Sequence, residues 1–200
     1  MTKFQAYAAN FELYPNEGEA FHHLLPLLSK VNRVDFTFLV NDPSVNQGQM
    51  NSNFDDQLEK ELLKNGAESW KLTLPTEIPQ EFDFTFMYSR KKVAVEIEKT
   101  NREKILRDIL KCHLYQYSGA DFAIIGLPRN YPHTHGVWDL FGFGKERFSE
   151  CKTYGFGTHD KLGRILLWGY DQYDAVTDKL LTKQTRNLWR TKAAEGARSR

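Results

Sequence analysis

The chain has 200 residues, of which 40% are hydrophobic and 14% aromatic, and its formal net charge is +1. This composition predicts one folded domain with a substantial core and excludes a globally disordered chain. The small net charge also excludes a protein that binds nucleic acid through overall basicity. The two cysteines, and a beginning without the apolar stretch of a secretory signal, predict a cytoplasmic protein with reduced thiols.

The first third of the chain predicts two helices and one strand. Apolar residues recur at helical spacing in Glu17–Val31, and Pro26 is expected to kink or break that helix. Arg33–Val40 has apolar residues at alternate positions, as a strand with one buried face does. The polar segment Asn41–Asn53 is rich in turn formers and predicts a loop, and Phe54–Asn65 is amphipathic and predicts a helix.

The middle of the chain predicts a β-hairpin followed by a helix and a strand. Phe82–Tyr88 and Val93–Glu98 both alternate and are joined by a short turn. Asn101–Tyr117 predicts a helix and Asp121–Leu127 a short buried strand, an order that indicates a parallel crossover. With Arg164–Tyr170 as the last strand, the sequence predicts an α/β (α+β) domain whose central mixed β-sheet is flanked by helices.

Two further segments are irregular in composition. Asn130–Gly163 is rich in glycine and aromatic residues and predicts loops and hairpins. Lys179–Arg200 carries seven lysine or arginine residues against one acid, Glu195. That composition favours a solvated, partly disordered tail, and the alternative is a tail that lies along phosphates.

The predicted hairpin collects carboxylates on one of its faces. Side chains alternate between the two faces of a strand, and the apolar residues of both strands must share the buried face. Asp83, Glu96 and Glu98 then share the other face. The tetrapeptide DFTF occurs a second time at Asp35, but no glutamate pair follows on a neighbouring strand, so Asp35 is expected to be a surface residue.

Neighbouring carboxylates repel one another, and this face therefore needs an explanation. One explanation is a bound Mg²⁺, which prefers oxygen ligands and takes a few carboxylates together with water. The other is a solvated strand face with lysine partners from the "RKK" turn or from Lys99. The spacing alone supports both equally. The histidines and cysteines match no spacing of a zinc module, which disfavours structural zinc.

An aspartate on one strand, followed on the next by Glu96-Ile97-Glu98 and then by a helix, resembles the active-site core of the PD-(D/E)XK nuclease superfamily. A glutamate at position 98, where lysine is usual, resembles type II restriction endonucleases of the BglII/BamHI kind. The preceding segment "NSNFDDQLEKELLKNGAESWKLTLPTEIPQEFDF" is similar to the helix, tryptophan and proline-bearing lead-in of these enzymes. The resemblance covers residues 51–129.

This resemblance implies a single restriction-endonuclease-like domain over residues 1–200, with a catalytic core at 51–129, DNA-contacting loops and the last strand at 130–178, and a basic C-terminal tail at 179–200. It implies a homodimer that hydrolyses double-stranded DNA at a specific, palindromic site. Asp83, Glu96 and the carbonyl of Ile97 would bind Mg²⁺, and Glu98 would orient or deprotonate the attacking water. The alternatives are a DNA-binding protein of the same fold without catalysis and a nuclease that selects branched DNA structure.

The candidate DNA-contacting residues are polar or basic side chains that follow the acidic strand or lie in the glycine-rich and aromatic stretch. They are Lys99, Asn101, Arg102, Lys104, His133, His135, Lys145, Arg147, Lys152, Lys161 and Arg164.

Overall fold

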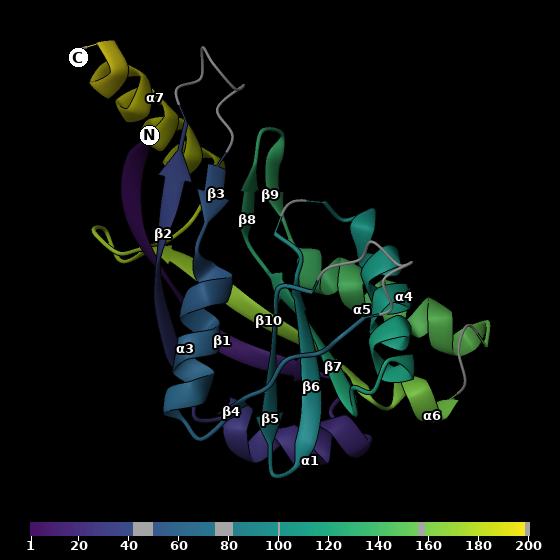
Figure 1. The fold of residues 1–200 in the computed structure, drawn as a ribbon. Helices are drawn as coiled ribbons and strands as arrows, with labels where there is room; N and C mark the ends of the chain where they lie inside the picture. Colours follow the sequence, from purple (N-terminus) through teal and green to yellow (C-terminus); the bar gives the residue numbers. More distant parts are fainter. Residues whose placement is uncertain (42–49, 75–81, 100, 156–158, 199–200) are drawn as a thin grey trace.

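The computed structural model describes residues 1–41, 50–74, 82–99, 101–155 and 159–198. They form a mixed nine-stranded sheet with helices on both faces (Figure 1). The elements of the first part are β1 (Thr2–Tyr14), α1 (Glu19–Leu28), β2 (Arg33–Val40), β3 (Met50–Ser52), α3 (Phe54–Lys64) and β4 (Glu68–Ser69). Among the described residues, no helix is long and apolar enough to cross a membrane.

The central and C-terminal elements follow in the same sheet or pack against it. They are β5 (Phe84–Tyr88), β6 (Lys91–Ile97), α4 (Lys104–Tyr117), β7 (Phe122–Pro128), β8 (Tyr131–His133), β9 (Gly136–Trp138), α5 (Leu140–Thr153), α6 (His159–Leu162), β10 (Ile165–Asp174), β11 (Lys179–Leu180) and α7 (Lys183–Arg198). β8 and β9 form a separate hairpin.

The strand order in the large sheet is β3-β2-β1-β10-β7-β6-β5-β4, and β11 pairs with β10. β6, β7 and β10 run parallel to one another, and the other neighbouring strands are antiparallel. α4 connects the adjacent parallel strands β6 and β7, which confirms the predicted crossover and the mixed sheet. Glu98 therefore lies just beyond the carboxyl end of β6, next to the carboxyl end of β7.

Two hydrophobic cores hold the helices on the two faces. The larger core joins α1, α3 and α7 to one face, through residues such as Leu24, Leu58 and Trp189. The second joins α4, α5 and the residue Leu162 to the other face of β7 and β10. Figure 1 shows α3 to the left of β5 and β6, and α4 and α5 to the right of these strands.

The hairpin of β5 and β6 forms with the apolar residues of both strands on one buried face, as predicted. Phe84 lies opposite Val95 and Phe86 opposite Val93, and all four side chains are buried in the larger core. Strict alternation predicts that Phe82 is buried with them. Phe82 lies outside this core, because β5 begins only at Phe84. Phe82 instead packs beside the Tyr115 ring of α4, with the ring centroids 6.1 Å apart.

Residues 140–153 form the helix α5, whereas loops and hairpins were predicted there. Asp139 caps this helix by accepting a hydrogen bond from the Gly142 N–H at 2.8 Å. Glycine is a poor helix former, but here it permits close packing. A Cβ atom on Gly144 would lie 2.5 Å from Leu127 Cδ1 on β7. Tertiary packing therefore overrides the local preference.

The basic C-terminal segment forms the helix α7, which corrects the prediction of a partly disordered tail. The Trp189 ring stacks on Phe4 with centroids 5.0 Å apart and lies 5.4 Å from the ring of Phe38. Ala193, one turn later, is also buried. These apolar residues anchor the helix on β1 and β2, because its charged residues can remain on the outer face.

Two N-terminal features also differ from the prediction. β1 was not anticipated, since its burial alternates only in part and its pairing with β10 shifts register between Ala9 and Glu12. α1 continues through Pro26 to Leu28 and is not broken there. The buried residues Leu24, Leu27 and Leu28 hold its last turns against the sheet.

Replacing Trp189 with alanine tests the anchoring of α7. Trp189→Ala is expected to lower the free energy of unfolding by about 3 kcal/mol, because it removes a large buried ring and leaves a cavity. The matched control is Leu188→Ala, since Leu188 is 51% exposed on the same helix. Denaturant unfolding should show a change below about 0.5 kcal/mol for the control. Equal effects of the two substitutions would contradict the packing of Trp189 against Phe4 and Phe38.

Candidate active site

Asp83 binds the backbone of β6 at the point where β5 diverges from it. The Asp83 N–H donates to the Val95 carbonyl at 3.1 Å, as in a regular ladder. Two residues further along β6, the Ile97 N–H donates to the Asp83 carboxylate at 2.6 Å. A side-chain oxygen thus takes the place of the backbone carbonyl that a neighbouring strand would offer. Asp83 thus holds the backbone between Glu96 and Glu98.

The environment of the Asp83 carboxylate is less solvated than the exposure of the whole residue suggests. The residue counts as exposed, but its carboxylate is turned toward β6 and is crowded by protein. This crowding raises the pKa of Asp83, while the Ile97 N–H and the Lys99 ammonium act in the opposite direction. Lys99 itself pairs with Asp55 of α3 at 2.9 Å.

Glu96 is a buried carboxylate that contacts two side chains of α4. Its Oε1 lies 2.6 Å from Lys111 Nζ and accepts a hydrogen bond from the Tyr115 hydroxyl. The side chains of Glu96 and Lys111 are only 9% and 11% exposed. Burial raises the pKa of Glu96 to about 7, although Lys111 and Tyr115 favour its charged form.

Glu98 lies where β6 passes into the connection to α4. Its N–H donates to the Gly126 carbonyl of β7 at 3.1 Å, and its Oε1 accepts the Asn101 N–H at 2.9 Å. The residue is 6% exposed. Its charge contributes to the raised pKa of Asp108, a buried residue of α4, whose main cause is burial.

Glu96 and Glu98 are therefore buried, Glu96 against α4, and for these two carboxylates the interpretation as a solvated strand face is wrong. The lysine partner of Glu96 comes from α4 and not from the turn or from Lys99. Asp108, Lys111 and Tyr115 were not identified from the sequence. Their spacing was a usable signal, because these polar residues recur at helical intervals beside the buried Ile109 and Cys112.

The donor chemistry of this site fits Mg²⁺, which prefers carboxylate and carbonyl oxygens. Asp83 and Glu96 would supply carboxylate ligands, and Ile97 would supply its backbone carbonyl. The Ile97 N–H donates to the Asp83 carboxylate, so these two residues are adjacent. In the described parts of the chain, however, no three His, Cys, Asp or Glu side chains are grouped so that they could hold a metal ion. A cation at Glu96 would have to share that carboxylate with Lys111.

Four candidate DNA contacts lie near the carboxylates, at or beyond the carboxyl end of β6. Asn101 binds Glu98 through its N–H, and its side chain accepts the Glu103 N–H at 2.9 Å. Arg102 lies over the Phe143 ring at 5.2 Å and pairs with Glu103. Lys104 begins α4, and Lys99 is held by α3.

His133 and His135 lie on the hairpin of β8 and β9, which leaves the sheet directly after the carboxyl end of β7 (Figure 1). The His133 ring stacks on Trp138 with centroids 3.8 Å apart and lies 5.3 Å from the His135 ring. The hairpin therefore projects from the end of the sheet that carries the carboxylates.

The remaining candidate cations lie elsewhere, and most pair with acids. Arg164 directly precedes β10, at the amino end of the parallel strands and thus opposite to Glu98. The structure does not bring these side chains together with the carboxylates. The pairs are Lys145–Glu12 at 3.6 Å, Arg147–Glu150 at 2.7 Å, Lys152–Glu17 at 3.1 Å and Arg164–Glu19 at 3.1 Å, and Lys161 is exposed.

Asp35, the aspartate of the other DFTF copy, is a surface residue, as predicted. Its side chain is 70% exposed and pairs with Arg33 at 2.9 Å. β1, β10 and β7 separate its strand, β2, from β6. Identical tetrapeptides therefore occupy chemically different environments.

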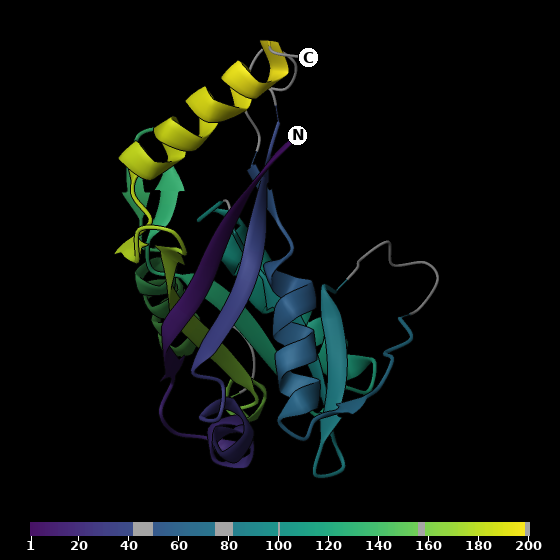
Figure 2. The same ribbon diagram turned by 90° about the vertical axis from the view of Figure 1, so that its left-hand side faces the viewer.

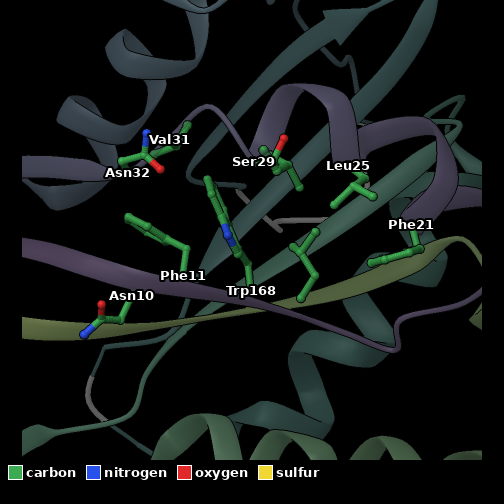
Figure 3. Close-up of a pocket in the computed structure, with 10 residues that line it drawn as sticks. Asn10, Phe11, Phe21, Leu25, Ser29, Val31, Asn32 and Trp168 are labelled. Carbon is green, nitrogen blue, oxygen red and sulfur yellow. The ribbon is translucent and has the colours of Figure 1, made fainter.

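A pocket of about 460 Å³ lies between α1 and the strands β1 and β10 (Figure 3). Figure 3 shows Phe11, Phe21, Leu25 and Trp168 around it. Its lining residues, all within the described chain, include no acidic, basic or histidine side chain. This pocket therefore lacks groups for acid–base chemistry, unlike the carboxylate site.

The sequence matches no protein-family model, and it matches no curated protein sequence.

Replacing Lys111 with methionine tests the buried ion pair. At about pH 5 Glu96 is mostly protonated in the folded protein, so Lys111→Met should cost less than about 1 kcal/mol. Near pH 9 the variant leaves a buried charged Glu96 without its partner, and the cost should rise to about 3 kcal/mol. The free energy of unfolding at both pH values is the measurement.

Adding Glu96→Gln to Lys111→Met provides the control, because it removes the titrating group. The double variant should lose most of the extra pH dependence. A destabilisation by Lys111→Met that is the same at both pH values would argue against the ion pair.

Proposed function

We propose that the protein is a Mg²⁺-dependent endonuclease that hydrolyses phosphodiester bonds of double-stranded DNA, in the manner of type II restriction endonucleases. The observation that carries the proposal is the position of Asp83, Glu96 and Glu98 at one end of two adjacent strands. The buried thiols Cys112 and Cys151 are unpaired, which is compatible with a cytoplasmic location.

The order of elements around the carboxylates supports this proposal. α3 is followed by the antiparallel strands β4, β5 and β6, then by α4 and by β7, which is parallel to β6. This is the order that the resemblance to PD-(D/E)XK nucleases implies, with the aspartate at the start of one strand and the glutamate pair at the end of the next. These elements, from α3 to β7, lie within residues 51–129, which the resemblance covers.

The side chains of the site can each contribute to phosphodiester hydrolysis. A bound Mg²⁺ supplies charge stabilisation at the scissile phosphate and lowers the pKa of a water ligand. Asp83 fixes the backbone between Glu96 and Glu98. Asp83 and Glu96 would bind the cation together, and Lys111 and Tyr115 hold the Glu96 carboxylate in place. Glu98 would orient the attacking water and accept its proton. Lys111 adds a positive charge that favours an anionic substrate.

A homodimer forms part of the proposal, because one carboxylate site cuts one strand. Two copies related by a two-fold axis would present their sites to both strands of a palindromic duplex. A monomer would release nicked circles from a supercoiled plasmid before linear DNA.

A second candidate is a DNA-binding protein of the same fold without catalysis. The observation that favours it is the Lys111–Glu96 contact at 2.6 Å. An ammonium group already neutralises the carboxylate that a metal ion would use. The lack of a third metal-binding group among the described side chains points in the same direction.

Plasmid cleavage in the presence of Mg²⁺ tests the enzyme. Wild-type protein is expected to convert supercoiled plasmids into discrete fragments, and Glu96→Gln should reduce the rate about 100-fold or more, because it removes a charged metal ligand. Asp35→Asn is the matched control, since it changes the aspartate of the other DFTF copy. Sequencing the fragment ends would then identify the recognition site and the cut position.

Two results would overturn the nuclease assignment. One is a wild-type protein that cuts none of a broad set of DNA sequences. The other is cleavage by Glu96→Gln at the wild-type rate, which would indicate a contaminating nuclease.

Calorimetric titration with Mn²⁺ separates the enzyme from the non-catalytic binder. An enzyme should bind Mn²⁺, and Asp83→Asn should weaken that binding about tenfold or more by removing one carboxylate ligand. The Asp35→Asn protein should bind Mn²⁺ like the wild type. Wild-type protein that shows no Mn²⁺ binding, with or without duplex DNA, would favour the binder.

A further inference from the structure

The β8–β9 hairpin and α7 originate at one buried junction. Asn130, the residue before β8, donates from its side chain to the Gln172 carbonyl at 2.8 Å and to the Leu181 carbonyl at 3.2 Å. Its side-chain oxygen accepts the Gln172 N–H at 2.7 Å. Leu181 lies two residues before the start of α7. Asn130 therefore places the first turns of α7 beside the hairpin, as Figure 2 shows.

α7 is held in place at its N-terminus and again about two turns later, at Trp189. Thr182 and Thr185 cap its beginning reciprocally, with each backbone N–H 3.3 Å from the other hydroxyl. Trp189 then packs on Phe4 and Phe38 in the core. Arg186 lies between these two anchors, so its position is defined by the fold and not by a flexible tail.

Arg186 is a buried cation without a carboxylate partner in the described chain. It is 9% exposed, and no ion pair joins it to an acidic side chain among the described residues. Arg190 follows one turn later, and the two guanidinium groups repel each other. Burial and this repulsion lower the pKa of Arg186. A buried charge of this kind is costly unless an anion completes it.

The surroundings of Arg186 connect it to the carboxylate site. Tyr131, at the base of the hairpin, interacts electrostatically with Arg186 and also with Glu98. His133 on the same strand experiences the positive charge of Arg186, and His135 lies beside it. The groups that interact with Arg186 in this way are Arg190, Tyr131 and His133, which are basic or aromatic. Tyr131 and His133 lie on β8, which follows the carboxyl end of β7 next to Glu98.

We propose that Arg186 and Arg190, together with the β8–β9 hairpin, bind a backbone phosphate of DNA next to the carboxylate site. A guanidinium group matches phosphate in geometry and charge, and phosphate contacts position a protein on DNA without reading its sequence. The assignment rests on the proposed function, because that function supplies DNA as the anion. It adds α7 to the surface over which the duplex lies.

Duplex binding measured by fluorescence anisotropy at several salt concentrations, with EDTA present to prevent cleavage, tests the assignment. Arg186→Met keeps the apolar part of the side chain and should weaken binding about tenfold or more. It should also reduce the slope of log K against log salt by about 1, the value of one phosphate contact. Lys64→Met is the matched control, because Lys64 is a 75% exposed cation of α3 outside the candidate DNA contacts, and it should change neither quantity.

The folding of the variants distinguishes binding from structure. Arg186→Met removes an uncompensated buried charge, so its thermal midpoint should equal or exceed that of the wild type. Arg186→Lys retains the charge and is the second variant. It should keep the salt slope and lose affinity severalfold, because a lysine lacks the planar fork of donors.

The outcomes separate this inference from the proposed function. Equal DNA affinity of wild type, Arg186→Met and Arg186→Lys would overturn the arginine site and leave the nuclease proposal intact. Arginine-dependent binding without cleavage would support the site and count against the nuclease. Wild-type protein that binds no DNA would overturn both. Stabilisation by inorganic phosphate that depends on Arg186, with unchanged duplex affinity, would mean a site for free phosphate and would overturn the DNA assignment.

Discussion

The contact between Glu96 and Lys111 joins the sheet to α4 and determines the character of the candidate site. It places a carboxylate of β6 and an ammonium group of α4 at 2.6 Å in a largely buried environment. Two charges in such a place are tolerated only when each compensates the other. The pair therefore helps to fix how α4 lies over β6. Burial raises the pKa of Glu96 to about 7 against the opposing effect of Lys111, so near pH 7 its charged and neutral forms are similarly populated.

The sequence predicted the sheet class, the hairpin and the crossover because their signals are local. Alternation defined β2 and β6, and helical spacing defined α3 and α4. α5 was missed because a glycine such as Gly144 inside a helix is explained only by its close approach to Leu127 and Leu167, which are distant in sequence. α7 was missed because, in composition alone, its many charges outweigh the buried apolar residues Trp189 and Ala193. β1 depends on partners far along the chain, which no local pattern reveals.

The candidate site was predicted in part for the same reason. Asp83, Glu96 and Glu98 follow from alternation along two neighbouring strands, and the structure places them at one end of those strands. Lys111 and Tyr115 belong to a helix that folds back over the strand, so their proximity to Glu96 is a tertiary property. The candidate DNA-contacting cations show that composition alone does not predict which side chains come together. Arg164 was proposed from composition, but strand direction places it at the opposite end of the sheet.

The pairing of β1 with β10 has a consequence for the order in which the protein acquires its structure. Ala6 of β1 lies opposite Asp174, and Phe4 stacks on Trp189, so the centre of the sheet joins residues from the two extremes of the chain. Contacts of such large sequence separation slow folding, because a long loop must close before they form. During synthesis on the ribosome, β1 can pair with β2 early. Its other edge stays unpaired until β10, in the last third of the chain, has been synthesised.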